Sequence, residues 1–422
     1  MAEEGGLHPA EKEVLQSPRT EEELREKLKP LVRIKGSLGG FLKPANLEEV
    51  YQGFEEGRFV AFEFEPLEDK EEKIAKLKKA IAGLEAYSQE LDQAKPLERI
   101  YSRYAQILAL SRKMRLARIE GDSQAFMEVA EQFYPQPDEA LYQEAEYRLR
   151  SCQDKLFPPG KKMKADKLKT LIRATYLRFG LEVSNIELVE GQSSAIRVVP
   201  RPGKAFKIEI AVDENGNSKV EEVLADYSLT KQAISAIRKA NGKKQPLKHL
   251  QKGRPMPGYL TDETGLQLYI ARELIQQGWE DKEQIPEKLL IPEITLVARK
   301  LAKEKDAYQV CQTLQEEYGI SEETAREMAI KVKRGTSGQA GEFYPRSGIA
   351  MVGLVDVGQW VNQAIDKGHF RGIKVENEIQ AVNLLLCCKC SVADLQEEGV
   401  LGQIDGFKLK DDDLVNLSNL FV

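Results

Sequence analysis

The chain has 422 residues, of which 41% are hydrophobic and 31% are charged, a balance typical of a folded globular protein with a sizeable core. Its net charge of -6 is the small difference between 62 basic and 68 acidic residues, which does not indicate a nucleic-acid-binding protein. No apolar run reaches the ~18 residues of a membrane helix, and the acidic N-terminus lacks the apolar segment of a secretory signal. We therefore expect a cytoplasmic protein.

The N-terminal part of the chain is predicted to be mostly helical. We expect residues 1–20 to form a disordered acidic tail and residues 21–158 to form a helical N-terminal region. A short strand is predicted where Phe62 and Phe64 alternate with glutamates. After it, the spacing of apolar residues indicates four successive helices, the last of which begins near Asp138.

The stretch FPPGKKMKADK marks a boundary, because it combines two prolines, a glycine and four lysines. Beyond it, the runs IELVEG, SAIRVVPRPG and KAFKIEIAVDENGNS alternate apolar and polar residues between turn signals, which predicts three short antiparallel strands. We assign residues 159–365 to a core domain that contains this sheet.

Helices are predicted to return at residues 259–278 and 291–334. The stretch that starts at LVARK is interpreted as two helices, because Gly319 is typical of a helix end and Ser321 of a helix start. Residues 366–422 form a predicted C-terminal helical extension.

The five cysteines are a poor basis for a disulfide framework, because their number is odd and three of them are crowded together. Cys387, Cys388 and Cys390 offer three thiolates, but His369 is the only histidine near them in the sequence. Since LLLCCKC continues a helical apolar pattern, we interpret these cysteines as small core residues rather than as a metal site.

Two neighbouring segments between residues 230 and 266 combine predicted helices with a distinctive turn. TKQAISAIRKANGKKQP, residues 230–246, predicts an amphipathic helix followed by the turn residues Asn241, Gly242, Gln245 and Pro246, and a second helix opens with DETGL at 262–266. This order resembles the microtubule-associated tyrosine carboxypeptidase family, whose bacterial members are called QEGLA-motif proteins. In that family a zinc helix reads H-E-x-x-x-H, a turn reads close to N-G-x-x-Q-P, and the second helix opens with Q-E-G-L-A or E-E-G-L.

Further segments carry the same resemblance in the same order. NLEEVYQGFEEG with FEFEPLE, EQFYPQPDEAL and TLQEEYGISEETAREMAIKVKRG are each similar to a segment of the family. The resemblance covers roughly residues 45–360. It implies an α+β fold with a zincin-like metallopeptidase core, in which a small antiparallel sheet packs on helices.

The residues on which a peptidase depends are replaced in this chain. Under the resemblance, the two zinc histidines fall on Thr230 and Ser235, the catalytic glutamate on Lys231, and the ligand glutamate of the second helix on Thr264. Neutral hydroxyls are poor zinc ligands, and a charged lysine cannot take a proton from water. We therefore expect neither a zinc cofactor nor catalysis.

A later segment of the family, Lys-Asp-x-x-Tyr-Leu-x-Gly, aligns with RSGIAMVG. Arg346 keeps the positive charge there, whereas Ser347 and Ala350 replace the acid and the tyrosine.

Other residues leave an alternative open. Asp226, His249 and Glu263 lie near the replaced positions in the sequence and would be a relocated ligand set in an active zinc metallocarboxypeptidase. A gap between Pro246 and Gly265 would also move Glu263 onto the ligand position. No such shift restores the histidines, because residues 186–245 contain none.

Residues 238–254, RKANGKKQPLKHLQKGR, carry seven lysines and arginines and no acid. This stretch, called the basic segment below, is either a solvated loop or a binding surface for an anion such as an acidic peptide or a protein C-terminus. The candidate ligand-binding residues are Lys231, Arg238, Asn241, Lys243, Lys244, Gln245 and Arg346. Nucleic acid is not expected, because no aromatic residues are interleaved, and no membrane contact is expected.

Three hypotheses follow from the sequence. The first is a catalytically inactive homologue of zinc-dependent tyrosine carboxypeptidases that binds an anionic peptide end. The second is an active enzyme with relocated ligands. The third is a non-catalytic scaffold that uses only the fold.

Overall fold

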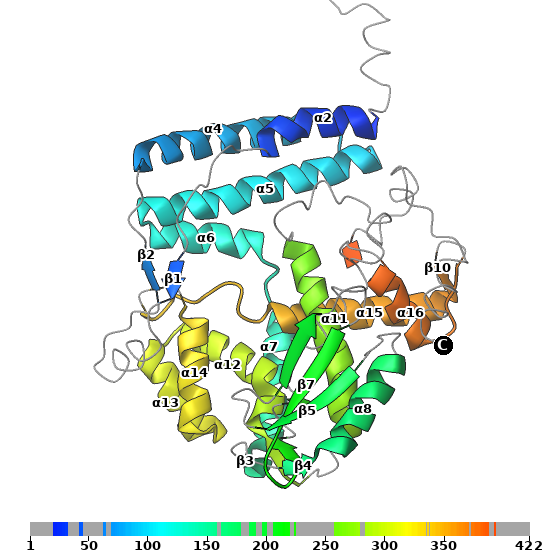
Figure 1. Ribbon diagram of the computed structural model, residues 1–422. Helices are drawn as coiled ribbons and strands as arrows, with labels where there is room; N and C mark the ends of the chain where they lie inside the picture. Colours follow the sequence, from blue (N-terminus) through cyan, green and yellow to red (C-terminus); the bar gives the residue numbers. More distant parts are fainter. Residues whose placement is uncertain are drawn as a thin grey trace, which may run out of the picture.

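A computed structural model shows the arrangement of most of the chain (Figure 1). It describes residues 20–32, 42–44, 62–64, 69–157, 162–178, 185–190, 196–200, 206–219, 223–224, 257–278, 283–334, 336, 338–370, 373–387 and 392–393. Residues 1–19 of the tail predicted at residues 1–20, and the whole basic segment, lie outside these ranges.

Long helices near the N-terminus stack on one another in a layer at the top of Figure 1. They are α2 (Glu21–Val32), α4 (Lys70–Gln89), α5 (Pro96–Glu120) and α6 (Ser123–Phe133). Leu24 of α2 packs in the same buried cluster as residues of α4 and α5, and the hydroxyl of Tyr87 donates to its carbonyl oxygen at 2.9 Å. The predicted helical N-terminal region is confirmed for these elements. The predicted strand is β2 (Phe62–Phe64), which pairs antiparallel with β1 (Leu42–Pro44).

A second group of helices surrounds its own apolar cluster. It contains α7 (Glu139–Cys152), α12 (Ile291–Ala302), α13 (Ala307–Tyr318) and α14 (Glu322–Val332). The predicted start of α7 is confirmed, because the Asp138 carboxylate accepts from the backbone N–H of Leu141 at 2.8 Å.

The region after residue 296 contains three helices, so the prediction of two is wrong. The chain turns at residues 303–306, and Asp306 forms a capping box with Gln309 at the start of α13. No glycine or proline marks this break. Gly319 and Ser321, which were predicted to end one helix and begin the next, do so, with Gly319 at φ 68°.

Three of the predicted strands form one small sheet. They are β5 (Asn185–Glu190), β6 (Ile196–Pro200) and β7 (Phe206–Val212), in the order β5-β7-β6. The prediction that all three pair antiparallel is wrong, because β5 runs parallel to β7. β6 and β7 form a hairpin, and β7, whose Ile208 and Ile210 are buried, occupies the centre. Because β6 and β7 run in opposite directions, β5 is also antiparallel to β6, which lies on the other side of β7.

Shorter strand pairs tie distant parts of the chain together. These are β3 (Leu156–Phe157) with β9 (Ile285–Pro286), β4 (Lys162–Lys164) with β8 (Asn217–Lys219), and β10 (His369–Phe370) with β11 (Ile373–Lys374). Helices and small sheets occur as separate units, so the α+β class is confirmed.

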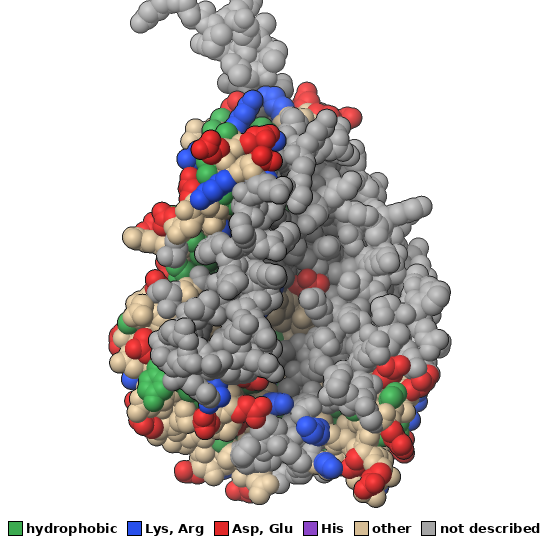
Figure 2. Space-filling model, turned by 60° about the vertical axis from the view of Figure 1, so that its left-hand side comes forward, with side chains coloured by type: hydrophobic (Ala, Val, Ile, Leu, Met, Phe, Trp, Pro, Cys, Tyr) green, Lys and Arg blue, Asp and Glu red, His purple; other side chains and the backbone are tan. Residues whose placement is uncertain are grey.

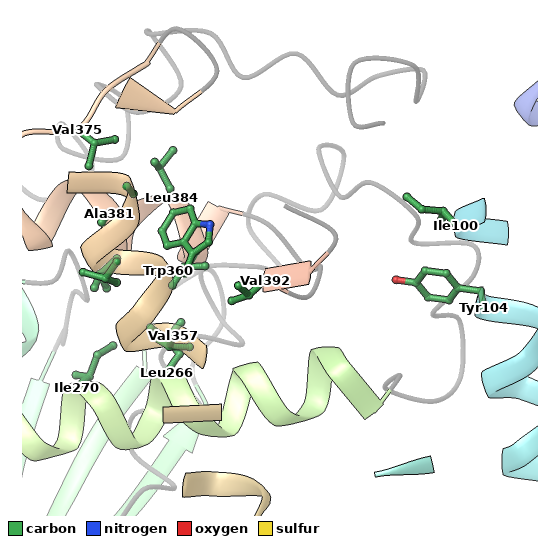
Figure 3. Packing of buried hydrophobic residues seen from close by; sticks show 14 of the residues in the cluster. Ile100, Tyr104, Leu266, Ile270, Val357, Trp360, Val375, Ala381, Leu384 and Val392 are labelled. Atoms are coloured by element: carbon green, nitrogen blue, oxygen red, sulfur yellow. The ribbon is translucent and has the colours of Figure 1, made fainter. Parts of the chain in front are cut away.

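Four further helices contribute to the buried cluster that contains Leu24. They are α8 (Ala165–Arg178), α11 (Pro257–Gly278), α15 (Ile349–Lys367) and α16 (Glu378–Cys387). In this cluster, α11 contributes Leu266 and Ile270, and α15 contributes Val357 and Trp360, which face one another in Figure 3.

Polar side chains connect the second group of helices. Glu146 of α7 accepts hydrogen bonds from Lys300 of α12 at 2.9 Å and from the hydroxyl of Tyr318 at 2.9 Å. These bonds, of which the Lys300 bond has the largest effect, lower the pKa of Glu146 to about 2. Lys333 is fully buried and donates to the carbonyl oxygens of Ala302, Gln339 and Glu342 at 2.6–3.0 Å.

Acidic and basic side chains are interspersed over the described part of the face in Figure 2, which shows no broad patch of one sign. Within the described ranges, no helix combines the length and apolar character needed to cross a membrane. Cys152 and Cys311 are free thiols.

Candidate functional site

The two segments singled out by the resemblance on α11 and before α15 are in direct contact. DETGL lies in the second and third turns of α11, and RSGIAMVG leads into α15. The helices cross at two glycines, because a Cβ added to Gly265 would lie 2.5 Å from the backbone nitrogen of Leu354 and nearer to the carbonyl group of Gly353. A Cβ on Gly353 would likewise overlap the carbonyl group of Thr261. Only glycine permits this approach.

This crossing sets the directions of the neighbouring side chains on α11. Successive residues of an α-helix are rotated by about 100°, so Thr264 points about 100° away from the contact that Gly265 makes. Glu263 points nearly opposite to that contact. Because α11 is an uninterrupted helix, Glu263 takes the direction of Thr264 only if α11 rotates and the glycine contact breaks.

A buried ion cluster holds α11 from another side. Oε1 of Glu293, on α12, is paired with Arg272 of α11 at 2.5 Å and with Arg148 of α7 at 3.1 Å. Glu293 is 1% exposed, so its buried charge depends on these two partly exposed arginines for compensation. The orientation of α11 therefore depends on polar contacts as well as on apolar packing.

Arg346 lies in an exposed position on a tight turn just before α15. The turn spans residues 344–348, where the backbone N–H of Ser347 donates to the carbonyl oxygen of Tyr344 at 2.9 Å. Gly348 has φ 91°, a left-handed conformation that favours glycine. The candidate cation is therefore presented by a defined turn.

The buried side chain of Arg299 supports this turn from below. Its guanidinium is 1% exposed and donates to the carbonyl oxygen of Pro345 at 2.9 Å and to that of Ser347. It also donates to the side-chain oxygen of Gln136 and lies over the ring of Phe343, 4.7 Å from its centroid. In the described part of the chain no carboxylate pairs with it, and burial lowers the pKa of Arg299.

The same contact brings together two Tyr-Pro turns that are far apart in the sequence, YPQPD at 134–138 and YPRSG at 344–348. Gln136, which binds Arg299, donates in turn to the carbonyl oxygen of Tyr134 at 2.5 Å. Burial raises the pKa of Tyr134, and Tyr344 raises it further, whereas Arg346 lowers it. Arg346 is therefore close enough to Tyr134 to affect its ionisation.

The predicted metal ligands are only partly placed by the structure. Thr264 is half-buried on α11, and its neutral hydroxyl does not fit the role of a zinc ligand. Asp226 and His249, the other members of the relocated set, lie outside the described residues. Over the described ranges, no three His, Cys, Asp or Glu side chains come close enough to hold a metal ion.

The cysteine-rich stretch is described only at its start. Cys387 is the last residue of α16, as the helical interpretation predicts, and His369 is exposed on β10. Cys388 and Cys390 lie outside the described residues.

Most of the predicted ligand-binding residues also lie outside the described ranges. They are Lys231, Arg238, Asn241, Lys243, Lys244 and Gln245. Thr230 and Ser235, which align with the zinc histidines of the family, lie outside these ranges as well.

The sequence analysis missed Arg299 and Asp262. Arg299 follows Leu296 by three residues, which places both on one face of α12, and this spacing is the only signal of its burial. Asp262 stands inside DETGL but is not one of the aligned ligand positions. Its carboxylate accepts from the backbone N–H of Val392 at 2.6 Å.

Comparison with known proteins adds no assignment. No protein-family model matches this chain, and no curated protein matches it significantly.

Proposed function

We propose that this chain is a catalytically inactive relative of zinc-dependent tyrosine carboxypeptidases, with a zincin-like core, that binds the anionic end of a peptide. One observation carries the proposal. The two segments that resemble family motifs meet at the Gly265–Gly353 crossing, while Thr264 stands where an acidic zinc ligand is expected. This contact supports an active-site architecture that is retained without its metal chemistry.

The charge pattern indicates the class of ligand. The basic segment carries seven cations and no acid, and it precedes α11 directly in the sequence. Lysine and arginine bind carboxylates through charge-assisted hydrogen bonds, which are about twice as strong as neutral ones. A peptide that ends in several carboxylates is the ligand that this segment suits best.

Arg346 extends the proposed binding surface. Its exposed guanidinium stands on a turn that Arg299 fixes, so little backbone order has to be gained on binding. Tyr134 and Tyr344, which are partly exposed on the two Tyr-Pro turns, are candidates to contact an apolar part of the ligand.

The proposal is tested by titrating the protein with a fluorescent peptide that ends in four glutamates. Lys231→Glu is expected to weaken binding. Lys243→Glu combined with Lys244→Glu is expected to weaken it at least tenfold, because each reversal replaces an attraction of about 1 kcal/mol by a repulsion. Binding should also weaken as salt is raised to about 0.5 M.

Arg346→Gln has a matched control at the far end of the same helix. A cation just before a helix N-terminus is unfavourable by about 0.3–1 kcal/mol, so Arg346→Gln should not destabilise the fold, and reduced binding would report the lost contact. Lys367→Gln removes an exposed cation from the last turn of α15 and should leave binding unchanged.

Unchanged binding in all the charge variants, or no binding by the wild type, would refute the proposed function. Zinc bound at one ion per chain after dialysis against a weak chelator would instead support the enzyme with relocated ligands. Asp226→Ala, His249→Ala and Glu263→Ala should then each lower the zinc content.

A further inference from the structure

Two arginines from different helices share one oxygen of a buried carboxylate. Oε1 of Glu293, in the first turn of α12, is paired with Arg148 of α7 at 3.1 Å and with Arg272 of α11 at 2.5 Å. Because both nitrogens lie within 3.1 Å of the same atom, they are at most about 6 Å apart. Three separate helices therefore bring two positive charges together.

The carboxylate of Glu293 meets these arginines on one side only. Its Oε2 atom is buried and accepts no hydrogen bond from the described residues. An ordinary arginine–carboxylate pair uses two parallel hydrogen bonds to the two oxygens. Here both guanidiniums meet at Oε1, and the side chains of Arg148 and Arg272 are 38% and 28% exposed, whereas that of Glu293 is 1% exposed. Glu293 thus lies between the arginines and the core, where it orients them without facing solvent.

The cluster holds more positive than negative charge. A guanidinium is always charged in a protein, so two arginines face one carboxyl group and at least one positive charge is left over. Among the described residues, no other acidic side chain pairs with Arg148 or Arg272. Arg272 also lies 3.5 Å from Sδ of Met351, but a thioether is only a weak acceptor. Since each guanidinium has five N–H donors, most donors of the pair are left for solvent or a ligand.

Apolar packing fixes the three helices that carry the cluster. One buried residue lies close in the sequence to each charged residue, namely Leu149 on α7, Leu268 on α11 and Ile294 on α12. All three belong to the same apolar cluster, and the three helices lie beside one another in the lower part of Figure 1. Little backbone order therefore has to be gained when a ligand binds between the arginines.

We propose that Arg148 and Arg272 form a binding site for a phosphoryl group, either inorganic phosphate or a phosphate monoester. The oxygens of a phosphate point in tetrahedral directions, so they accept from two guanidiniums at once, and a monoester carries about −1.5 to −2 charge at pH 7. A carboxylate has two oxygens in one plane, which match the fork of a single arginine. The site goes beyond the proposed function and does not depend on it, because none of its residues belongs to the basic segment.

Protection from phenylglyoxal, a reagent for accessible guanidiniums, tests the site in the wild-type protein. The chain is modified at less than about one arginine per molecule, with and without about 10 mM inorganic phosphate at constant ionic strength. Mass spectrometry of peptides then gives the rate at each arginine. A site with a Kd of about 1 mM is about nine-tenths occupied under these conditions, so Arg148 and Arg272 should react at least about threefold more slowly.

Arg173 is the matched control, because it is an exposed arginine on a different helix, α8. Its rate should not change with phosphate, and acetate at the same concentration should protect Arg148 and Arg272 less than phosphate does. Equal rates with and without phosphate, equal slowing at Arg173, or equal protection by acetate would overturn the proposal. Glycerol phosphate separates the two sources, since stronger protection than by free phosphate indicates a monoester and weaker protection indicates free phosphate.

Arg148→Gln tests whether the two arginines act together. In this variant Arg272 keeps its pair with Glu293, so the buried carboxylate stays compensated. Phosphate should no longer protect Arg272, because one guanidinium makes fewer charge-assisted hydrogen bonds than two. Arg173→Gln should leave the protection as in the wild type.

Undiminished protection of Arg272 in Arg148→Gln, once circular dichroism shows that the variant is folded, would overturn the paired site. If that variant does not fold, the rates in the wild-type protein still decide the outcome.

Discussion

Replacing Gly353 by alanine should disrupt the crossing on which the candidate site depends. The added methyl group would lie 2.7 Å from the carbonyl carbon of Thr261 and closer still to the carbonyl oxygen, whereas ordinary contacts begin at 3.4 Å. The overlap is with the backbone of α11, which cannot move aside as a flexible side chain does. The two helices must therefore separate by about 1 Å.

The cost of this separation follows from what the interface buries. Leu266 and Ile270 on α11 face Val357, Trp360 and Val361 on α15, and all five are at most 3% exposed. A gap of about 0.5–1 Å removes a quarter to a half of the dispersion energy of each contact across it. We expect a loss of at least about 3 kcal/mol in the free energy of unfolding, at the upper end of overpacking effects.

Gly358→Ala is the matched control on the same helix. The nearest atom to its added methyl group is Cε2 of Tyr269 at 3.9 Å, which is an ordinary contact. Since alanine favours a helix over glycine, this variant should be more stable than the wild type by about 0.5–1 kcal/mol. Both substitutions replace a glycine of α15 by alanine, but Gly353→Ala should lower the free energy of unfolding and Gly358→Ala should raise it.

Urea unfolding followed by tryptophan fluorescence measures both effects, because Trp360 is buried in α15 beside the crossing. The reasoning is refuted if Gly353→Ala unfolds within about 0.5 kcal/mol of the wild type, or if both variants shift in the same direction.

Three further predictions concern buried and paired charges. Arg299→Met should lower the free energy of unfolding by about 2–3 kcal/mol, because it leaves two backbone carbonyls and the side-chain oxygen of Gln136 without their donor. It should also speed hydrogen exchange at the amide of Ser347. Unchanged exchange there would show that Arg299 does not hold the turn. Burial lowers the pKa of Lys333 from 10.5 to about 8, so between these pH values the unfolded chain binds more protons than the folded chain. The free energy of unfolding of the wild type, relative to that of Lys333→Met, should therefore rise by about 3 kcal/mol from pH 8 to 10.5. A difference that does not change with pH in urea titrations would contradict this. The pKa of Glu146 is lowered from 4.5 to about 2, so its contribution to the free energy of unfolding is complete above pH 4.5 and is lost as the pH falls through 2. After allowance for solvent screening we expect this contribution to be about 2 kcal/mol. Glu146→Gln should remove it when unfolding is measured between about pH 5 and 2.

Local signals predicted much of the secondary structure. Asp138, Ser321 and Gly319 mark helix ends at the expected positions, because caps depend on the chemistry of one residue and its near neighbours. The break between α12 and α13 was missed, since it depends on a cap at Asp306 without a glycine or proline. The parallel pairing of β5 with β7 was also missed, because strand order is a tertiary property.

For the candidate site, the sequence supplied the segments and the structure supplied their contact. DETGL and RSGIAMVG were singled out separately, and nothing in their composition showed that Gly265 lies against Gly353. The roles of Arg299 and Asp262 were invisible for the same reason, since their partners, Pro345 and Val392, are distant in the chain. A buried polar group is recognised only when the atoms that satisfy it are known.

The sequence by itself determined the periodic helices, the strand segments, most helix ends and the concentration of positive charge in the basic segment. These features depend on residues within a few positions of one another or on charge, which needs no fold. Only the tertiary structure decided the strand order, the glycine crossing, the support of Arg346 by Arg299 and the return of the chain to Asp262. Each of these joins residues that become neighbours only when burial of apolar surface packs the helices together.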